Sequence, residues 1–345
     1  MKITSQIVDP TRYPGWHELI LLNPEYSFFH SSAWAKTLSE SYAYIPVFFM
    51  IFQNKAPVSI IPLMEVKSIL TGRRGVSLPF SDYCPPIIRE KGHFEIVLDD
   101  MVKYGTKNGW KYLELRGGHE FLGNFSPANR FYRHVLDLER DSDTIFHAFK
   151  GSTRRNIRKA LKENLRVSIS HSLTSVMEFY RLNSITRKDH GLPPQPRSFF
   201  ENVHNYIISK GKGIVVLASF RGRNIAGAIF FHFGRRAIYK YGASERAFQS
   251  KRPNNLVMWE AIKWYSERGF ESISFGRTEP ENTGLLQFKR AWGTREEVLR
   301  YYRYDFRARS FVVNIPQTQA FAPIFRRMPI PLLNLLGSFL YRHVG

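Results

Sequence analysis

In the second half of the chain, the strongest candidate for catalysis is a lysine that follows an aromatic residue. Lys289 follows Phe288 inside a largely apolar stretch from Gly284 to Gly293. Because this lysine follows an aromatic residue in an apolar helix, we expect its ammonium to lie at the edge of a ligand-binding cleft. The alternative is an ordinary surface lysine, since lysines are mostly exposed.

Three further segments place polar groups beside predicted strand ends. They are Tyr239–Ser244, Arg252–Asn255 and Phe275–Thr278. Asn254 is predicted to cap a helix, and Gly276 falls where a strand ends. Because α/β sheets bind ligands beyond strand ends, the sequence predicts a ligand site here.

A basic cluster precedes these segments, over residues 150–162. Arg154, Arg158 and Lys162 fall on one side of a predicted helix. Positive charges in the first turns of a helix oppose its macrodipole unless an anion is bound nearby. The cluster is therefore either a phosphate-binding face or a solvated helix surface.

An internal repeat must position these groups. Lys103–Gly118 and Lys263–Thr278 both read as a helix end, a glycine stop, an aromatic residue and an alternating strand. Hairpin signals precede them at Val47–Lys67 and Val215–Arg235. Matching order and spacing predict that one α+β unit has been duplicated.

The length of 345 residues accommodates two domains at about 150 residues each. We place the first domain at residues 1–145, the second at 146–315, and a basic amphipathic tail at 316–345. A helix near the N-terminus is expected to begin at Ser31 or Ser32, either of which can cap it.

The tail has two interpretations. Four apolar residues share one face of a predicted helix: Leu332, Leu336, Phe339 and Leu340. This face either packs back on the first domain or inserts into a membrane surface. In the second case Arg326, Arg327 and Arg342 would lie at anionic head groups.

Composition excludes several classes of protein. The net charge of 50 − 29 = +21 predicts a polyanionic partner, whether nucleic acid, an anionic membrane or a phosphorylated substrate. The single cysteine, Cys84, excludes an intrachain disulfide, and no metal-ligand spacing occurs. Neither a signal peptide nor a spanning helix is predicted, so we expect a cytoplasmic protein, peripheral at most on the inner face of the plasma membrane.

The segment from Tyr241 to Gly293 resembles the FemABX family. The resemblance rests on YGAS at 241–244, PN at 253–254, FG at 275–276, and GL, FK and WG within 284–293. These proteins are aminoacyl-tRNA-dependent peptidyltransferases that build peptidoglycan cross-bridges. Further similarity at His30–Lys36 and Phe179–Gly191 extends over most of the chain.

A broader FemAB-like group, encoded with exopolysaccharide and exosortase systems, is more similar still. The shared segments include Ser77–Tyr83, Glu114–Arg116 and Phe275–Thr278. The fold that the resemblance implies is α+β with a mixed sheet, in two tandem GNAT-type acyltransferase domains. This agrees with the repeat.

The resemblance also implies residue roles. Lys289 matches the catalytic lysine, which would hold the acyl carbonyl or its developing oxyanion. The implied substrate-binding residues are Lys36, Arg187, Lys188, Tyr241, Arg277 and Phe288. Where the family has Asp-Pro, this chain has Arg116-Gly117-Gly118, so a carboxylate base at that place is in doubt.

The implied reaction is attack of an acceptor amine on an activated acyl carbonyl, which forms an amide. Asp82, Glu279 and Glu281 are candidates by position to accept the amine proton, as are groups of the substrates themselves. The implied donor is aminoacyl-tRNA, with no metal or other cofactor. The implied acceptor is an amine-bearing nucleotide- or lipid-linked precursor of the cell envelope.

Two other functions stay open. One is an acyl-CoA-dependent N-acyltransferase acting on amino sugars of a surface polysaccharide. Coenzyme A is disfavoured because Gln249–Asn254, before the predicted helix, lacks the glycines that let backbone amides hold a pyrophosphate. The other is a non-catalytic RNA- or membrane-binding protein built on a transferase fold.

Overall fold

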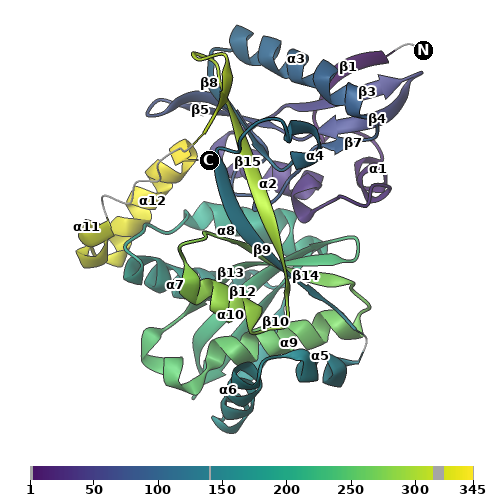
Figure 1. The fold of residues 1–345 in the computed structure, drawn as a ribbon. Helices are drawn as coiled ribbons and strands as arrows, with labels where there is room; N and C mark the ends of the chain where they lie inside the picture. Colours follow the sequence, from purple (N-terminus) through teal and green to yellow (C-terminus); the bar gives the residue numbers. More distant parts are fainter. Residues whose placement is uncertain (1–2, 140, 314–321, 345) are drawn as a thin grey trace. The chain divides into compact units, whose positions relative to one another are not determined.

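The chain forms two compact units in a computed structural model that describes residues 3–139, 141–313 and 322–344 (Figure 1). Unit 1 takes its residues from Met1–Phe131, Val298–Gln317 and Leu340–Gly345. Unit 2 takes them from Tyr132–Glu297 and Thr318–Phe339. Both units are discontinuous in sequence, whereas we predicted contiguous domains at 1–145 and 146–315.

Unit 2 contains a mixed sheet whose strands run in the order β10 (Arg166–Ser170), β11 (Gly213–Phe220), β12 (Arg223–Phe233), β13 (Arg236–Ser244), β14 (Ser272–Thr278) and β9 (Asn129–Asp137). The β13–β14 pair is parallel, and its neighbouring pairs are antiparallel. This is the α+β class with a mixed sheet that the sequence predicts.

Helices cover both faces of this sheet. One face packs against α5 (Ser142–Ala148), α6 (Gly151–Lys162) and α9 (Pro253–Glu267), with a buried core that includes Phe149, Ile157 and Trp292. The other face carries α7 (Leu173–Asp189) and α8 (Arg197–Tyr206). Two shorter helices, η3 (Arg246–Lys251) and α10 (Thr283–Arg290), follow β13 and β14.

Unit 1 contains two sheets. One has the order β1 (Ile3–Val8), β3 (Phe48–Gln53), β4 (Ala56–Ile61) and β7 (Ile87–Ile88). The other has the order β15 (Arg295–Asp305), β8 (Trp110–Arg116), β6 (Gly72–Val76), β5 (Met64–Ser68) and β2 (Ile45–Pro46), with β16 (Ser310–Val312) beside β15. Because β15 pairs with β8 over Tyr301–Asp305, this part of the chain belongs to unit 1.

Helices of unit 1 include α1 (Trp16–Leu21), η1 (Phe28–His30), α2 (Ser32–Tyr42), α3 (Lys91–Lys107) and α4 (His119–Leu122). The side chain of Ser31 caps α2 by accepting from the backbone N–H of Trp34, which confirms the predicted start of this helix. The C-terminal helices are α11 (Ala322–Arg327) and α12 (Ile330–Val344).

The predicted repeat is present in both units. In each, a helix ends before a glycine of positive φ, Gly109 (66°) after α3 and Gly269 (70°) after α9, and a strand follows. In each, a two-residue turn with positive φ at both positions closes the preceding hairpin, Asn54-Lys55 in unit 1 and Arg221-Gly222 in unit 2. The duplication read from the sequence is therefore confirmed at the level of topology.

Within the described part of the chain, no helix combines the length and the apolar character that crossing a membrane requires.

Candidate active site

The two parallel strands of unit 2 separate soon after they meet. Arg236–Ile238 of β13 pair with Ser272–Ser274 of β14, and the ladder between them ends there. Beyond this point β13 remains paired with β12, and β14 with β9. The gap between strand ends is where α/β sheets accommodate ligands.

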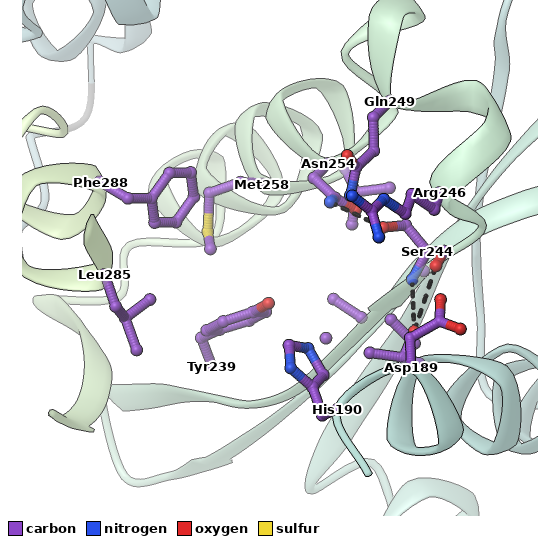
Figure 2. Close-up of a pocket in the computed structure, with 16 residues that line it drawn as sticks. Asp189, His190, Tyr239, Ser244, Arg246, Gln249, Asn254, Met258, Leu285 and Phe288 are labelled. Carbon is purple, nitrogen blue, oxygen red and sulfur yellow. Dashed lines mark hydrogen bonds between the residues drawn. The ribbon is translucent and has the colours of Figure 1, made fainter. Parts of the chain in front are cut away.

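A cavity of about 630 Å³ opens along the separated part of β13 (Figure 2). One end has apolar walls, formed by Tyr239, Val257, Met258, Leu285 and Phe288. The other end is polar, and its side chains come from α7, β13, η3 and α9: Asp189, His190, Ser244, Arg246, Gln249 and Asn254. Figure 2 shows the labelled apolar and polar side chains gathered at opposite ends. The cavity therefore suits a ligand with one apolar and one polar part.

A phenol and small residues shape the wall beside β13. A Cβ added at Gly242 would lie 1.6 Å from the hydroxyl oxygen of Tyr239, so only glycine leaves room for this ring. Burial raises the pKa of Tyr239 to about 12. The phenol therefore stays protonated at neutral pH and can donate a hydrogen bond.

The polar end is ordered by hydrogen bonds among its own residues. The backbone N–H of Ser244 donates to the Thr186 hydroxyl (3.0 Å), and Asn254 Nδ2 donates to Ser244 Oγ (3.0 Å). The prediction that Asn254 caps α9 was wrong, because the helix begins at Pro253 with Arg252 at the cap position. Proline favours the first helical position, and this moves Asn254 into the helix, where its side chain fixes β13.

Lys289 is buried, with 3% of its surface exposed, which overturns the alternative of a surface lysine. Its Nζ donates to the carbonyl oxygens of Gly276 (3.0 Å) and Arg277 (3.1 Å). Gly276 has a φ of 68° at an irregularity in β14. Such a bulge interrupts the ladder and leaves these carbonyls for the ammonium.

The neighbouring Phe288 lines the apolar end of the cavity. The FK pair on α10 therefore joins the cavity wall to the β14 bulge. Arg277 lies in that bulge and contributes its backbone carbonyl to Lys289.

Tyr241 lies on the opposite face of the sheet from the cavity-lining Tyr239. In the ladder with β12, Ile229 pairs with Tyr241 and the next residue, Phe230, pairs with Tyr239. Lys240 therefore has no pairing partner on β12 and is an extra residue in β13. Because this bulge reverses the alternation, the two tyrosines point to opposite faces. The Tyr241 ring packs against Phe199, Phe200 and Phe231.

The other predicted substrate-binding residues lie in two places. Arg187 and Lys188 form the last turn of α7, where Arg187 Nε donates to the Pro193 carbonyl (3.3 Å). Their neighbours Asp189 and His190 line the cavity. Lys36 belongs to α2 in unit 1, where its Nζ lies 2.7 Å from Glu40 Oε1.

The three candidate bases, and Glu114 near the position where the family has Asp-Pro, have different surroundings. Glu114 is buried, which opposes its ionisation, but Arg116 and Arg303 hold its pKa below the ordinary value. A carboxylate bound by two guanidiniums is a poor proton acceptor. Glu279 is partly exposed and Glu281 exposed in the segment between β14 and α10. Asp82 of unit 1 accepts from the Tyr301 hydroxyl through its backbone oxygen (2.5 Å).

His134 was not identified from the sequence. It lies on β9 beside the β14 bulge, is fully buried, and has Nε2 2.9 Å from Glu296 Oε2. Burial lowers its pKa, and the nearby Lys289 ammonium lowers it further. His134 therefore remains neutral at pH 7. Met258 was also missed as a cavity residue, because an apolar residue in a helix is typical of a core.

Comparison with known proteins supports this geometry. Residues 148–290 match the family model described as an acetyltransferase (GNAT) domain. The lipid II:glycine glycyltransferase of Staphylococcus haemolyticus is 20% identical over 230 residues, which cover 46% of this chain and 55% of that protein. A crystal structure of FemX covers 88% of this chain and 97% of its own, with a TM-score of 0.69 and 15% identity.

In sequence and in fold, the chain is similar to FemAB-type transferases built on the GNAT fold. A tandem GNAT protein from clavulanic acid biosynthesis has the same fold, with a TM-score of 0.59 and 10% identity over 88% of this chain and 99% of its own. The predicted tandem GNAT architecture is thus confirmed. This FemAB-like chain spans about half the length of the S. haemolyticus relative.

Proposed function

We propose that this FemAB-like protein is an aminoacyltransferase that forms an amide on an amine-bearing precursor of the cell envelope. The observation that carries the proposal is the cavity along β13, which Phe288 lines next to the buried Lys289. The cavity would bind the activated acyl donor. The similarity of the chain to the S. haemolyticus glycyltransferase and to the FemX fold supports this class of reaction.

We propose aminoacyl-tRNA as the donor. The segment before α9 forms the η3 helix and contains no glycine, so it does not offer the glycine-rich amide loop that binds a pyrophosphate. Arg155, Arg158 and Lys159 are exposed on α6 and supply positive charge for a polyanion. The net charge of +21 has the same sign.

In the proposed reaction the acceptor amine attacks the ester carbonyl of the donor. A C–N bond forms, the ester C–O bond breaks, and the ribose hydroxyl leaves with a proton, which balances the proton lost by the amine. Lys289 would stabilise the negative charge that develops on the carbonyl oxygen. Tyr239 would donate to a polar atom of the bound donor. Arg277 and Phe288 would shape the donor site, and Lys36, Arg187, Lys188 and Tyr241 are kept as candidates for acceptor binding.

The acceptor would be a nucleotide- or lipid-linked precursor, since the S. haemolyticus relative is named for lipid II. A lipid-linked acceptor would bring the protein to the inner face of the plasma membrane.

Transfer can be tested with total aminoacyl-tRNA and a lipid II-type acceptor. Mass spectrometry of the acceptor should detect an added aminoacyl residue with the wild type and not with Lys289→Gln, which retains hydrogen-bond donors but lacks the charge. Transfer from acyl-CoA to an amino sugar, with calorimetric binding of coenzyme A and none of tRNA, would contradict the proposal and favour the coenzyme-A-dependent alternative. Salt-dependent RNA binding without turnover of either donor would favour the non-catalytic one.

A further inference from the structure

Helix α12 has one side fixed against the protein. Leu333 is fully buried, and a Cβ added at Gly337 would lie 2.0 Å from the Pro194 carbonyl oxygen. At its end, the carbonyl of His343 accepts from the guanidinium of Arg74 (2.8 Å) and the hydroxyl of Thr71 (3.0 Å). These contacts set the rotation of the helix about its axis.

The opposite side exposes a row of apolar residues, which we call the apolar row. It consists of Leu332, Leu335 and Phe339, exposed by 48%, 68% and 50%. Their spacing of three and four residues places them on one helix face. Ile324 of the preceding helix α11 is also 59% exposed. Contiguous exposed apolar surface of this kind is typical of an interaction site.

The charges beside the apolar row distinguish between occupants. Residues 322–344 contain Arg326, Arg327 and Arg342 and no Asp or Glu, and all three arginines are exposed. A second copy of the chain would bring identical cations together, and like charges oppose association. An anionic lipid surface offers both an apolar layer and negative phosphates.

We propose that α12 lies in the surface of an anionic membrane, with the apolar row in the acyl layer and Arg326, Arg327 and Arg342 at the lipid phosphates. Helix α12 would then be the surface through which the protein contacts the membrane. This proposal stands on the helix alone and does not rest on the acyl-transfer reaction, because vesicle binding can be measured without turnover.

The test is co-sedimentation of the full chain with vesicles of phosphatidylcholine, with or without phosphatidylglycerol. The wild type should bind the anionic vesicles and not the neutral ones. The double variant Leu335→Glu/Phe339→Glu should bind at least about tenfold more weakly, because two large apolar side chains are lost from the membrane. Arg326→Ala/Arg327→Ala should bind about 25-fold more weakly, since each surface arginine contributes about fivefold.

Leu22→Glu is the matched control, because Leu22 is 84% exposed outside this helix, and this variant should bind like the wild type. Thermal unfolding of each variant checks the fold. Absence of wild-type binding, or equal binding by the double variant, would overturn the proposal. A wild-type dimer that becomes monomeric in Leu335→Glu would assign the apolar row to a second copy instead. Retained vesicle binding in a protein without transferase activity would count against the proposed reaction only.

Discussion

The two units share a plan and differ at the point where their parallel strands end. In unit 1 the pairing of β6 with β8 continues to Val76 and Glu114, and the backbone N–H of Ser77 extends it (2.8 Å to Glu114 O). In unit 2 the equivalent pairing stops after three residues and a cavity opens. The two ladders therefore differ in register, since the unit 1 ladder contains a shift and the unit 2 ladder does not, and the described cavity lies beside the unit 2 ladder.

Unit 1 fills the equivalent position with its own residues. The backbone N–H of Cys84 donates to the Arg116 carbonyl (3.0 Å), which brings the loop after β6 against the end of β8. The Arg116 guanidinium donates to the carbonyls of Leu78 (3.3 Å) and Ser81 (3.0 Å). Each unit therefore buries a cation on backbone carbonyls beside this position, Arg116 in unit 1 and Lys289 in unit 2. In unit 2 the neighbour of this cation, Phe288, lines the cavity.

The largest expected effect separates these two cations. Lys289→Gln should lower the transfer rate at least about 100-fold, because a neutral amide stabilises an oxyanion less than an ammonium does. Arg116→Gln should mainly destabilise the fold, by about 3 kcal/mol, since it removes a guanidinium from the buried Glu114 carboxylate. Transfer kinetics and chemical denaturation of both variants measure the difference. Wild-type turnover by Lys289→Gln would remove the proposed role of this residue.

Acidification should weaken unit 1 through His30. Burial lowers the pKa of this histidine to about 4, so it is neutral in the folded protein, whereas the unfolded chain protonates near pH 6.5. The stabilisation that neutral His30 gives the folded state is fully present above pH 6.5. It is lost as the pH falls toward 4, which lowers the free energy of unfolding by about 3 kcal/mol in all. Denaturant titrations between pH 7 and pH 4 measure this loss.

His30→Gln should have a shallower pH dependence of its unfolding free energy than the wild type. The unfolding free energies of the wild type over the same pH range are the reference. Equal slopes for the wild type and His30→Gln would show that another group governs the acid sensitivity.

A third prediction concerns the wall of the cavity in unit 2. Gly242→Ala should displace the Tyr239 ring into the cavity and lower kcat/KM for transfer about tenfold, because a Cβ collides with the phenol oxygen. Gly284→Ala on α10 has nothing within 4 Å of the added Cβ and should keep the wild-type value. If both variants transfer at the wild-type rate, the donor does not bind beside Tyr239.

The smallest expected effect compares the two hairpin turns. Lys55 in unit 1 has a φ of 70°, and the matching position in unit 2 is Gly222 with a φ of 79°. Since only glycine adopts this conformation without strain, Lys55→Gly should stabilise the protein by about 0.5–1 kcal/mol and Gly222→Lys should destabilise it by a similar amount. Chemical denaturation measures both. Changes of the same sign would break the equivalence of the two turns.

Local signals predicted much of this fold. The glycines at 109 and 269 marked both helix ends, and the turns at Asn54 and Gly222 marked both hairpins, because left-handed backbone favours few residue types. The pairing of β8 with β15 and of β14 with β9 joins segments far apart in the chain and leaves no such mark. The discontinuous units follow from it.

The site was less predictable, since it depends on packing. Helical spacing placed Lys289 beside Phe288 but could not say which side of α10 would be buried. The β14 bulge that receives its ammonium depends on Gly276, which the sequence presented only as a strand end. His134 becomes relevant only because β9 lies beside that bulge.

The extra residue at Lys240 affects how this strand should be aligned with others. It shifts the alternation of side chains between the two faces of the sheet by one residue. Each position after Lys240 therefore corresponds to the position one residue earlier in a strand without the bulge. Aligning β13 with a relative that lacks the insertion therefore calls for a one-residue gap at 240. Without that gap, a role assigned to a tyrosine in one protein would be transferred to the wrong aromatic side chain in the other.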